Sequence, residues 1–195
     1  DRLADLNICS QRALVERFDA TIGAGSVLMP YGGRCQRTPE QGMAAKIPVP
    51  DGKTYTGTVM THGFDPSVSR WSPFHGAVYA ILESVSRAAA LGADWRDIRM
   101  SFQEYFERLR DVPERWGKPL AALLGAYWMQ NEMGLAAIGG KDSMSGSFDE
   151  LDVPPTLVSF AAAPVDVRRV CSSALKGAGH RIICLTAPMD KRMLP

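Results

Sequence analysis

The segment from Gly139 to Ser145, which reads Gly-Gly-Lys-Asp-Ser-Met-Ser, holds the residue types best suited to chemistry. Two adjacent glycines let backbone N–H groups approach an anion closely, and Lys141 adds a positive charge. Asp142 offers a carboxylate for a metal ion, and Ser143 and Ser145 offer hydroxyls. Together these groups suit a phosphate and its cation. The same residue types also favour a plain exposed turn, so both interpretations stay open at this point.

This segment differs from the phosphate-binding P-loop of nucleoside triphosphatases. Gly134 and Gly139 have the required four residues between them, but Gly140 then separates the second glycine from Lys141. Asp142 stands where that motif has Ser or Thr, and no helix is expected to follow. The spacing therefore argues against an unrelated P-loop enzyme.

Glu83 is the second candidate, because it lies within a predicted helix four residues before Arg87. One interpretation is an exposed ion pair between the two side chains. The other is a carboxylate turned into a cleft to hold Mg²⁺. The three histidines, His62, His75 and His180, have no Cys or carboxylate arrangement typical of a catalytic triad in the neighbouring sequence. His62 lies in a loop that contains glycine, so it is the histidine best suited to line a pocket.

Composition excludes several classes of protein. The 195 residues are 46% hydrophobic and 22% charged, which indicates a folded globular chain rather than a disordered one. With 22 Lys and Arg against 21 Asp and Glu, no broad field attracts nucleic acid or an anionic membrane. The four cysteines form no Cys-x-x-Cys pair and have no His at metal-ligand spacing, which suits a reducing compartment. No stretch approaches the ~20 apolar residues of a membrane span, and no signal peptide is visible, so we expect a cytoplasmic protein.

Hydrophobic periodicity and turn residues predict the elements that position these groups. Ser72 and Pro73 begin the clearest helix, as N-cap and first helical residue. The predicted helices are 8–18, 73–91 and 117–133, with a short helical stretch over 102–112. The predicted strands are 26–29, 42–48, 54–61, 97–102, 135–138, 156–162 and 180–185. This order indicates an α+β fold with helices on one face of a mixed, mostly antiparallel sheet.

The chain reads as one domain and the start of another. It begins at Asp1 without Met and stops at Pro195 just after a predicted strand, so we expect an excerpt from a longer protein. Proline, aspartate and glycine residues interrupt the pattern between 164 and 178. We therefore expect residues 1–165 to form one domain, and residues 166–195 to form a linker and the first strand of the next.

Several segments resemble the second half of phosphoribosylformylglycinamidine synthase. The most specific is the Lys-Asp-Ser-Met-Ser part of the segment from Gly139, which Pro154-Pro155-Thr156-Leu157-Val158 follows. Asp5-Leu6-Asn7 with Phe18-Asp19 also match, as does Ser72-Pro73-Phe74-His75-Gly76-Ala77 running into Glu83. The resemblance covers essentially the whole chain, and it is nearest to a long, single-chain bacterial form of the enzyme.

The resemblance implies a fold and an activity. This chain would be the aminoimidazole-ribonucleotide-synthetase-like first domain of the second half, whose sheet pairs with a sibling domain to form a barrel. The whole enzyme converts formylglycinamide ribonucleotide, ATP and glutamine to the amidine: ATP activates the amide oxygen as a phosphate ester, and ammonia displaces it. The first synthetase half and a glutaminase domain would be its partners. Because the family's catalytic histidines and glutaminase site lie there, we expect the isolated chain to be inactive, although it could form a homodimer.

Residue by residue, the resemblance assigns the loop to ATP and substrate. Gly140 and Lys141 would contact ATP phosphates, with Gly139 beside them, while Ser143 and Ser145 would contact substrate or phosphate. Asp142 would help to hold Mg²⁺ or fix Lys141.

Glu83 matches a helix carboxylate that binds Mg²⁺ at a second, structural nucleotide site in some family members. Here the sequence departs from the family. The family pattern has Asn where this chain has Arg87, and Gly63 or His62 replaces an upstream metal-binding Asp. Because Arg87 would repel a cation, we expect this auxiliary site to be altered or absent.

Two alternatives are also compatible with the sequence. One is another ATP enzyme of the same superfamily, such as aminoimidazole ribonucleotide synthetase or selenophosphate synthetase, against which the Lys-Asp-Ser-Met-Ser loop argues. The other is a non-catalytic dimerisation or scaffold domain whose sheet is its whole function.

Overall fold

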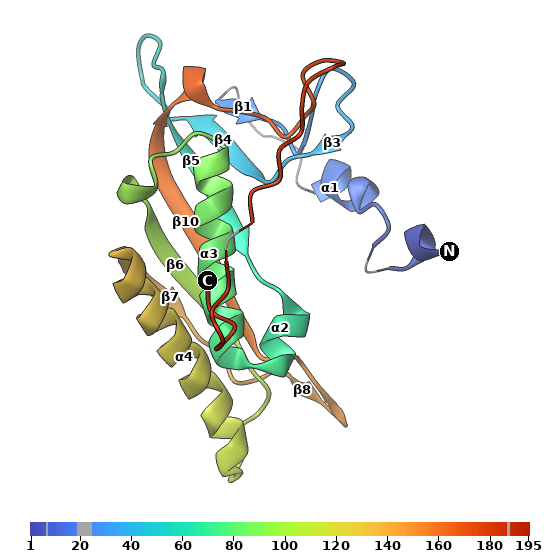
Figure 1. Cartoon of the computed structure of the whole chain (residues 1–195), viewed down its shortest axis with the longest axis vertical. Coiled ribbons are helices and arrows are strands. Elements are labelled where there is room, and N and C mark those ends of the chain that lie inside the picture. The colour runs from blue at the N-terminus through green and yellow to red at the C-terminus, as the bar shows by residue number, and fades with distance from the viewer. Residues whose placement is uncertain (7, 19–24, 187) are drawn as a thin grey trace.

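A six-stranded sheet is the central element of the computed structural model, which describes residues 1–6, 8–18, 25–186 and 188–195 (Figure 1). The strand order is β1-β4-β5-β10-β6-β7. Neighbouring strands run antiparallel except β6 and β7, which are parallel, so the mixed, mostly antiparallel sheet is confirmed. The strands are β1 (Ser26–Leu28), β4 (Gly42–Lys46), β5 (Thr56–Gly63), β6 (Arg99–Tyr105), β7 (Ala137–Lys141) and β10 (Thr156–Asp166).

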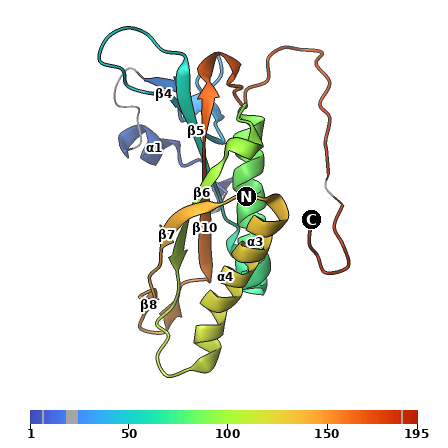
Figure 2. The ribbon, with the colours of Figure 1, turned by 90° about the vertical axis from the view of Figure 1, so that its left-hand side faces the viewer.

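Two long helices, α3 (Pro73–Ala90) and α4 (Pro113–Met133), lie on the same side of this sheet (Figure 2). The predicted start of α3 is confirmed, because the Ser72 hydroxyl accepts a hydrogen bond from the backbone N–H of His75. Val78 and Ile81 of α3 are completely buried. Burying a side chain of this kind stabilises a fold by roughly 1.5–3 kcal/mol. The predicted α+β fold with helices on one face is therefore correct.

The opposite face of the sheet carries half-exposed apolar side chains. Along β5 and β10 buried and exposed residues alternate, as expected when only one face is covered. Met60 and Phe160 lie on the uncovered side, with exposed fractions of 44% and 40%. Met43 of β4 pairs with Met60, and Tyr105 of β6 lies at the far end of the same face. We call these four residues the open face.

Smaller elements complete the fold. They are the helices α1 (Arg12–Phe18) and α2 (Pro66–Trp71), the two-residue pairs β2 (Tyr31–Gly32) with β3 (Thr38–Pro39) and β8 (Ser147–Phe148) with β9 (Leu151–Asp152), and the 3-10 turns Arg2–Ala4, Trp95–Asp97 and Val167–Arg169. Helix α2 was not expected. Its sequence signal is Asp65-Pro66, because the Asp65 carboxylate accepts from the N–H groups of Ser67 and Val68. No helix in the described ranges has the length and hydropathy of a membrane span.

The prediction of a helical stretch over 102–112 is wrong. Strand β6 continues to Tyr105, because its residues pair with β10 as far as Thr156. The following residues to Val112 are irregular and lead directly into α4, which begins at Pro113 rather than near 117. Charged residues over 104–111 favour a helix locally, but the ladder with β10 determines the outcome.

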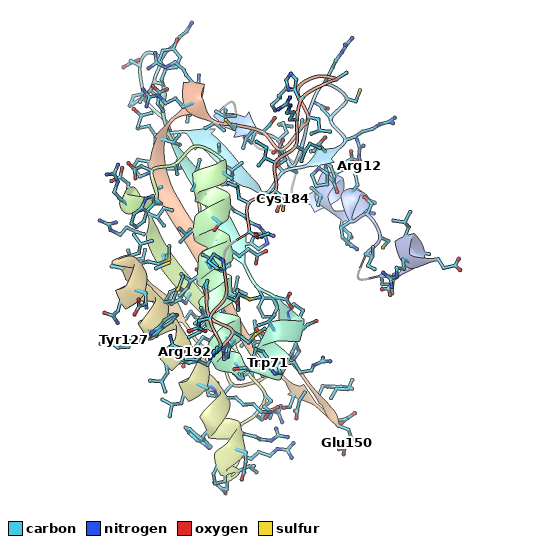
Figure 3. All side chains as sticks on the ribbon, viewed as in Figure 1. Arg12, Trp71, Tyr127, Glu150, Cys184 and Arg192 are labelled. Carbon is cyan, nitrogen blue, oxygen red and sulfur yellow. The ribbon has the colours of Figure 1, made fainter. Side chains whose placement is uncertain are left out.

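The predicted strand over 180–185 does not form. Ile182, Ile183 and Leu185 are about four-fifths or more exposed, and no described strand lies beside them to supply hydrogen bonds. The end of the chain contacts α3, where Met189, Arg192 and Met193 lie beside His75 and Tyr79. Here the Arg192 carbonyl oxygen lies 2.8 Å from His75 Nε2, and Figure 3 shows Arg192 next to α3. The division into residues 1–165 and 166–195 stays a prediction. Asn7 and Asp19, which contribute to the family resemblance, lie outside the described residues.

Candidate phosphate and metal site

The two glycines of the candidate loop lie in β7, an edge strand of the sheet. Gly139 has a φ of 149°, a backbone conformation that L side chains rarely adopt. A Cβ atom on Gly140 would lie 2.4 Å from the carbonyl oxygen of Phe102 on β6. The backbone conformation therefore requires glycine at position 139, and the close approach of β6 requires it at position 140. The outer edge of β7 pairs with no described strand, so the N–H groups on that edge take no part in a strand ladder.

The loop after β7 runs beside the end of β6. The N–H of Phe106 donates to the carbonyl oxygen of Ser143 at 2.9 Å, and the N–H of Gly146 donates to the carbonyl oxygen of Phe106 at 2.9 Å. The Ser143 and Ser145 hydroxyls lie 2.9 Å apart. These bonds fix both ends of the loop and bring its two serines together, as the phosphate-site interpretation needs.

Lys141 and Asp142 are exposed, and neither makes an ion pair or a side-chain hydrogen bond with any residue that the structure describes. Lys141 lines two hollows, one on each face of the sheet, of about 360 Å³ each. The hollow on the open side is also lined by Ser101, Gln103 and Phe160. An unpaired ammonium group at the edge of two concave surfaces can bind an anionic ligand without first breaking a salt bridge.

Glu104 is a buried carboxylate beside the candidate loop that the sequence reasoning did not consider. It projects from β6 towards the helices and is only 5% exposed, and its Oε1 atom has no hydrogen-bond partner among the described residues. Burial and the neighbouring Asp142 carboxylate raise the pKa of Glu104 to about 7. A signal was present: Met100, Phe102 and Glu104 alternate along one side of a strand. The incorrect helix over 102–112 obscured it.

Glu83 is paired within its own helix. Its Oε1 atom lies 2.6 Å from Arg87 Nη2, and its Oε2 atom accepts a hydrogen bond from the N–H of Phe64 at 2.9 Å. Arg87 Nη1 also donates to the carbonyl oxygen of His62 at 2.7 Å. Both carboxylate oxygens of Glu83 therefore have partners, and the nearest cation is a guanidinium group.

Gly63 and His62 supply no carboxylate to this group. A Cβ on Gly63 would lie 2.1 Å from the carbonyl oxygen of Ala80, so the close approach of α3 to β5 requires glycine there. The His62 side chain is exposed. Partial burial and the positive charge of Arg87 lower the pKa of His62, and Glu83 partly opposes them. No cluster of three or more metal-ligating side chains occurs in the described part of the chain.

Comparison with known proteins gives a consistent result, although no family model matches the chain. Phosphoribosylformylglycinamidine synthase subunit PurL of Thermoplasma acidophilum is 22% identical over 191 residues, which are 97% of this chain and 24% of that protein. The same subunit of Picrophilus torridus is 23% identical over 92 residues, which are 47% of this chain and 12% of that protein. The chain thus spans about a quarter or less of these relatives.

Among solved structures, Thermotoga maritima PurL complexed with ADP superposes with a TM-score of 0.67 and 18% identity, over 86% of this chain and 26% of that one. The chain is similar to phosphoribosylformylglycinamidine synthase. This similarity confirms the resemblance predicted from the Lys-Asp-Ser-Met-Ser loop, and the superposition shows that the fold is shared with the synthase subunit. The roles of individual loop residues in a synthase of this kind stay predictions.

Proposed function

We propose that the chain is a synthetase domain of phosphoribosylformylglycinamidine synthase, the ligase that converts formylglycinamide ribonucleotide, glutamine and ATP to formylglycinamidine ribonucleotide in purine biosynthesis. The observation that carries the proposal is the similarity to a synthase subunit over 97% of the chain. Solved structures of the Thermotoga maritima subunit are described as complexes with ATP, with ADP and with FGAR, which supports nucleotide and substrate binding by this fold.

In this proposal, the end of β7 and the loop after it bind the phosphates. Lys141 has no ion pair within the described chain, so its charge is available to the phosphates of ATP. Gly139 and Gly140 keep the edge strand free of side chains at the point where N–H groups must approach an anion. Ser143 and Ser145 offer adjacent hydroxyls for phosphate or substrate oxygens. Phosphoryl transfer needs mainly positioning and charge neutralisation, which these groups supply.

Of the two residues expected to bind magnesium, Asp142 suits the ion and Glu83 does not. Asp142 is exposed and unpaired among the described residues, so its carboxylate can take a cation that accompanies the phosphates. When bound, Mg²⁺ would neutralise phosphate charge there. Glu83 does not fit, because Arg87 and the Phe64 N–H already engage its oxygens. We therefore leave the auxiliary magnesium site out of the proposal.

The open face is the surface for the sibling domain. Met43, Met60, Tyr105 and Phe160 remain 37–44% exposed, and pairing with a second sheet would bury them. The first synthetase half and the glutaminase domain are the proposed partners within one cytoplasmic enzyme. Because the family's catalytic histidines belong to those parts, the isolated chain is proposed to bind ligands without turnover.

A scaffold domain is the second candidate, and the same open face favours it. A sheet with one apolar uncovered side can associate without any nucleotide. The two functions separate in an ammonia-dependent synthase assay on the full-length protein. Lys141→Ala should abolish turnover, while Lys53→Ala, in the exposed connection between β4 and β5, should leave it intact. Equal turnover of both variants would favour the scaffold.

A further inference from the structure

A groove of about 360 Å³ lies behind the candidate loop, between α4 and the β6–β7 pair. Glu104 lines it from β6, and Asp142 lines it from the loop. Leu123 and Gln130 line it from α4, and the rest of the wall is Phe102, Ala137 and the backbone around Gly139 and Gly140. Two carboxylates therefore share one concave surface with a single lysine, Lys141.

Nothing within the described chain satisfies the buried end of Glu104. The amide of Gln130 also lines the groove, but its Nε2 donates to the Ala126 carbonyl oxygen at 3.1 Å. Its Oε1 accepts from the N–H of Ala137 at 2.9 Å. Leu123 and Phe102 have no polar side-chain atoms. A buried carboxylate oxygen without a donor is rare in native proteins and marks a place where an ion or water binds.

The chemistry of the groove selects a cation. Glu104 and Asp142 line the same groove, and a cation bound between them would favour the charged form of both carboxyl groups. Carboxylate oxygens are hard ligands. Mg²⁺ is commonly held by one or two carboxylates, with water and substrate phosphate completing its octahedron. The groove has the carboxylates, and Lys141 at its rim is suited to the phosphate.

We propose that Glu104 and Asp142 together bind a divalent metal ion, Mg²⁺ in the cell, in the groove between α4 and β7. The inference rests on the proposed function, because the ion would lie beside the phosphates that Lys141 holds. It adds Glu104, a buried residue outside the loop, to the ligands of the site.

Mn²⁺ titration of the 195-residue chain tests this without any nucleotide, with water-proton relaxation as the readout. Wild type should bind Mn²⁺, and Mg²⁺ should displace it. Glu104→Gln and Asp142→Asn should each weaken binding at least about tenfold. Two control variants should bind as wild type: Glu83→Gln, and Glu150→Gln at the far tip of the β8–β9 hairpin (Figure 3).

No saturable Mn²⁺ binding by wild type, or unchanged binding by the folded Glu104→Gln variant, would overturn the proposal. Loss of binding in Glu83→Gln alone would also overturn it, because the metal would then lie at α3. If Glu104→Gln does not fold by circular dichroism, Asp142→Asn in the exposed loop decides the question. Nucleotide binding is measured separately with Lys141→Ala, so Mn²⁺ binding without nucleotide binding refutes the proposed function and leaves the metal site standing.

Discussion

Arg87 Nη2 lies 2.6 Å from Glu83 Oε1, one helical turn away on α3, and Arg87 Nη1 donates to the carbonyl oxygen of His62 at the end of β5. One guanidinium group therefore joins a helix carboxylate to the neighbouring strand. A divalent ion bound by Glu83 would have to compete with Arg87 for the carboxylate. In this chain the Arg87 side chain supplies the positive charge beside Glu83.

Replacing Arg87 should have a small effect on stability and none on metal binding. Both side chains are partly exposed, so Arg87→Asn should lower the free energy of unfolding by roughly 0.5–1 kcal/mol in urea denaturation. The variant should gain no Mn²⁺ site at α3, because Gly63 contributes no carboxylate. Mn²⁺ binding that appears in Arg87→Asn and disappears on adding Glu83→Gln would contradict this account.

Gly63 should tolerate no side chain. An added Cβ would meet the Ala80 carbonyl oxygen at 2.1 Å and the Ser84 N–H at 2.8 Å, both backbone atoms that cannot rotate away. Gly63→Ala should lower the free energy of unfolding by about 1–3 kcal/mol. Gly117→Ala in α4 is the matched control, because a Cβ there meets nothing within 4 Å. That variant should be more stable by about 0.5–1 kcal/mol, and equal effects of the two changes would be inconsistent with the packing described.

The Glu107 carboxylate should anchor the connection between β6 and α4 to the first turns of α4. Its buried carboxylate accepts from Lys118 Nζ at 2.7 Å, and Arg115 Nε lies 3.6 Å away while its Nη2 reaches Asp152 at 2.7 Å. Glu107→Gln leaves two cations with one anion, and should cost about 1–3 kcal/mol in urea unfolding. Glu16→Gln, which breaks the exposed pair with Arg12, should leave the unfolding midpoint unchanged. A midpoint for Glu107→Gln that matches wild type would refute the role of this network.

Stability should fall as pH rises from about 4.5 to about 7. Burial raises the pKa of Glu104 from 4.5 to about 7, so in this window the folded state holds a proton that the unfolded state has released. The folded state then loses stability with rising pH, by an amount on the order of 1–3 kcal/mol, since the buried carboxyl group must lose its proton against desolvation. Urea unfolding of wild type and Glu104→Gln in metal-free buffer at pH 5 and pH 8 measures the difference. Parallel pH dependence of the two proteins would show that Glu104 is not responsible.

Local signals predicted the parts of the fold that local physics determines. Ser72 and Pro73 begin α3 as expected, since an N-cap and a proline at the first helical position act over a few residues. The alternation along β10 likewise follows from its sequence, because one face of the strand is buried. The types of Lys141 and its glycines made them candidates for phosphate binding, with a plain turn as the alternative, and the family resemblance then assigned them to ATP phosphates.

Non-local partners explain the failures. Strand β6 extends to Tyr105 because β10 pairs with it, and nothing within residues 102–112 shows that a partner strand is available. Glu104 was overlooked for the same reason, since its burial depends on α4 packing over β6. Ile182 and Ile183 have strand-forming side chains, but in the described structure no strand lies beside them. Strand propensity alone could not show that β6 extends to Tyr105 while Ile182 and Ile183 form no strand.

Calorimetric titration of the chain with the magnesium complex of a non-hydrolysable ATP analogue is the most direct test of the phosphate site on β7. Wild type and Lys53→Ala should bind with the same affinity. Lys141→Ala should bind at least about tenfold more weakly, since a hydrogen bond between charged groups is worth about 1.5–3 kcal/mol. Equal affinity of Lys141→Ala and wild type, or no binding by any of the three proteins, would contradict a phosphate site on β7.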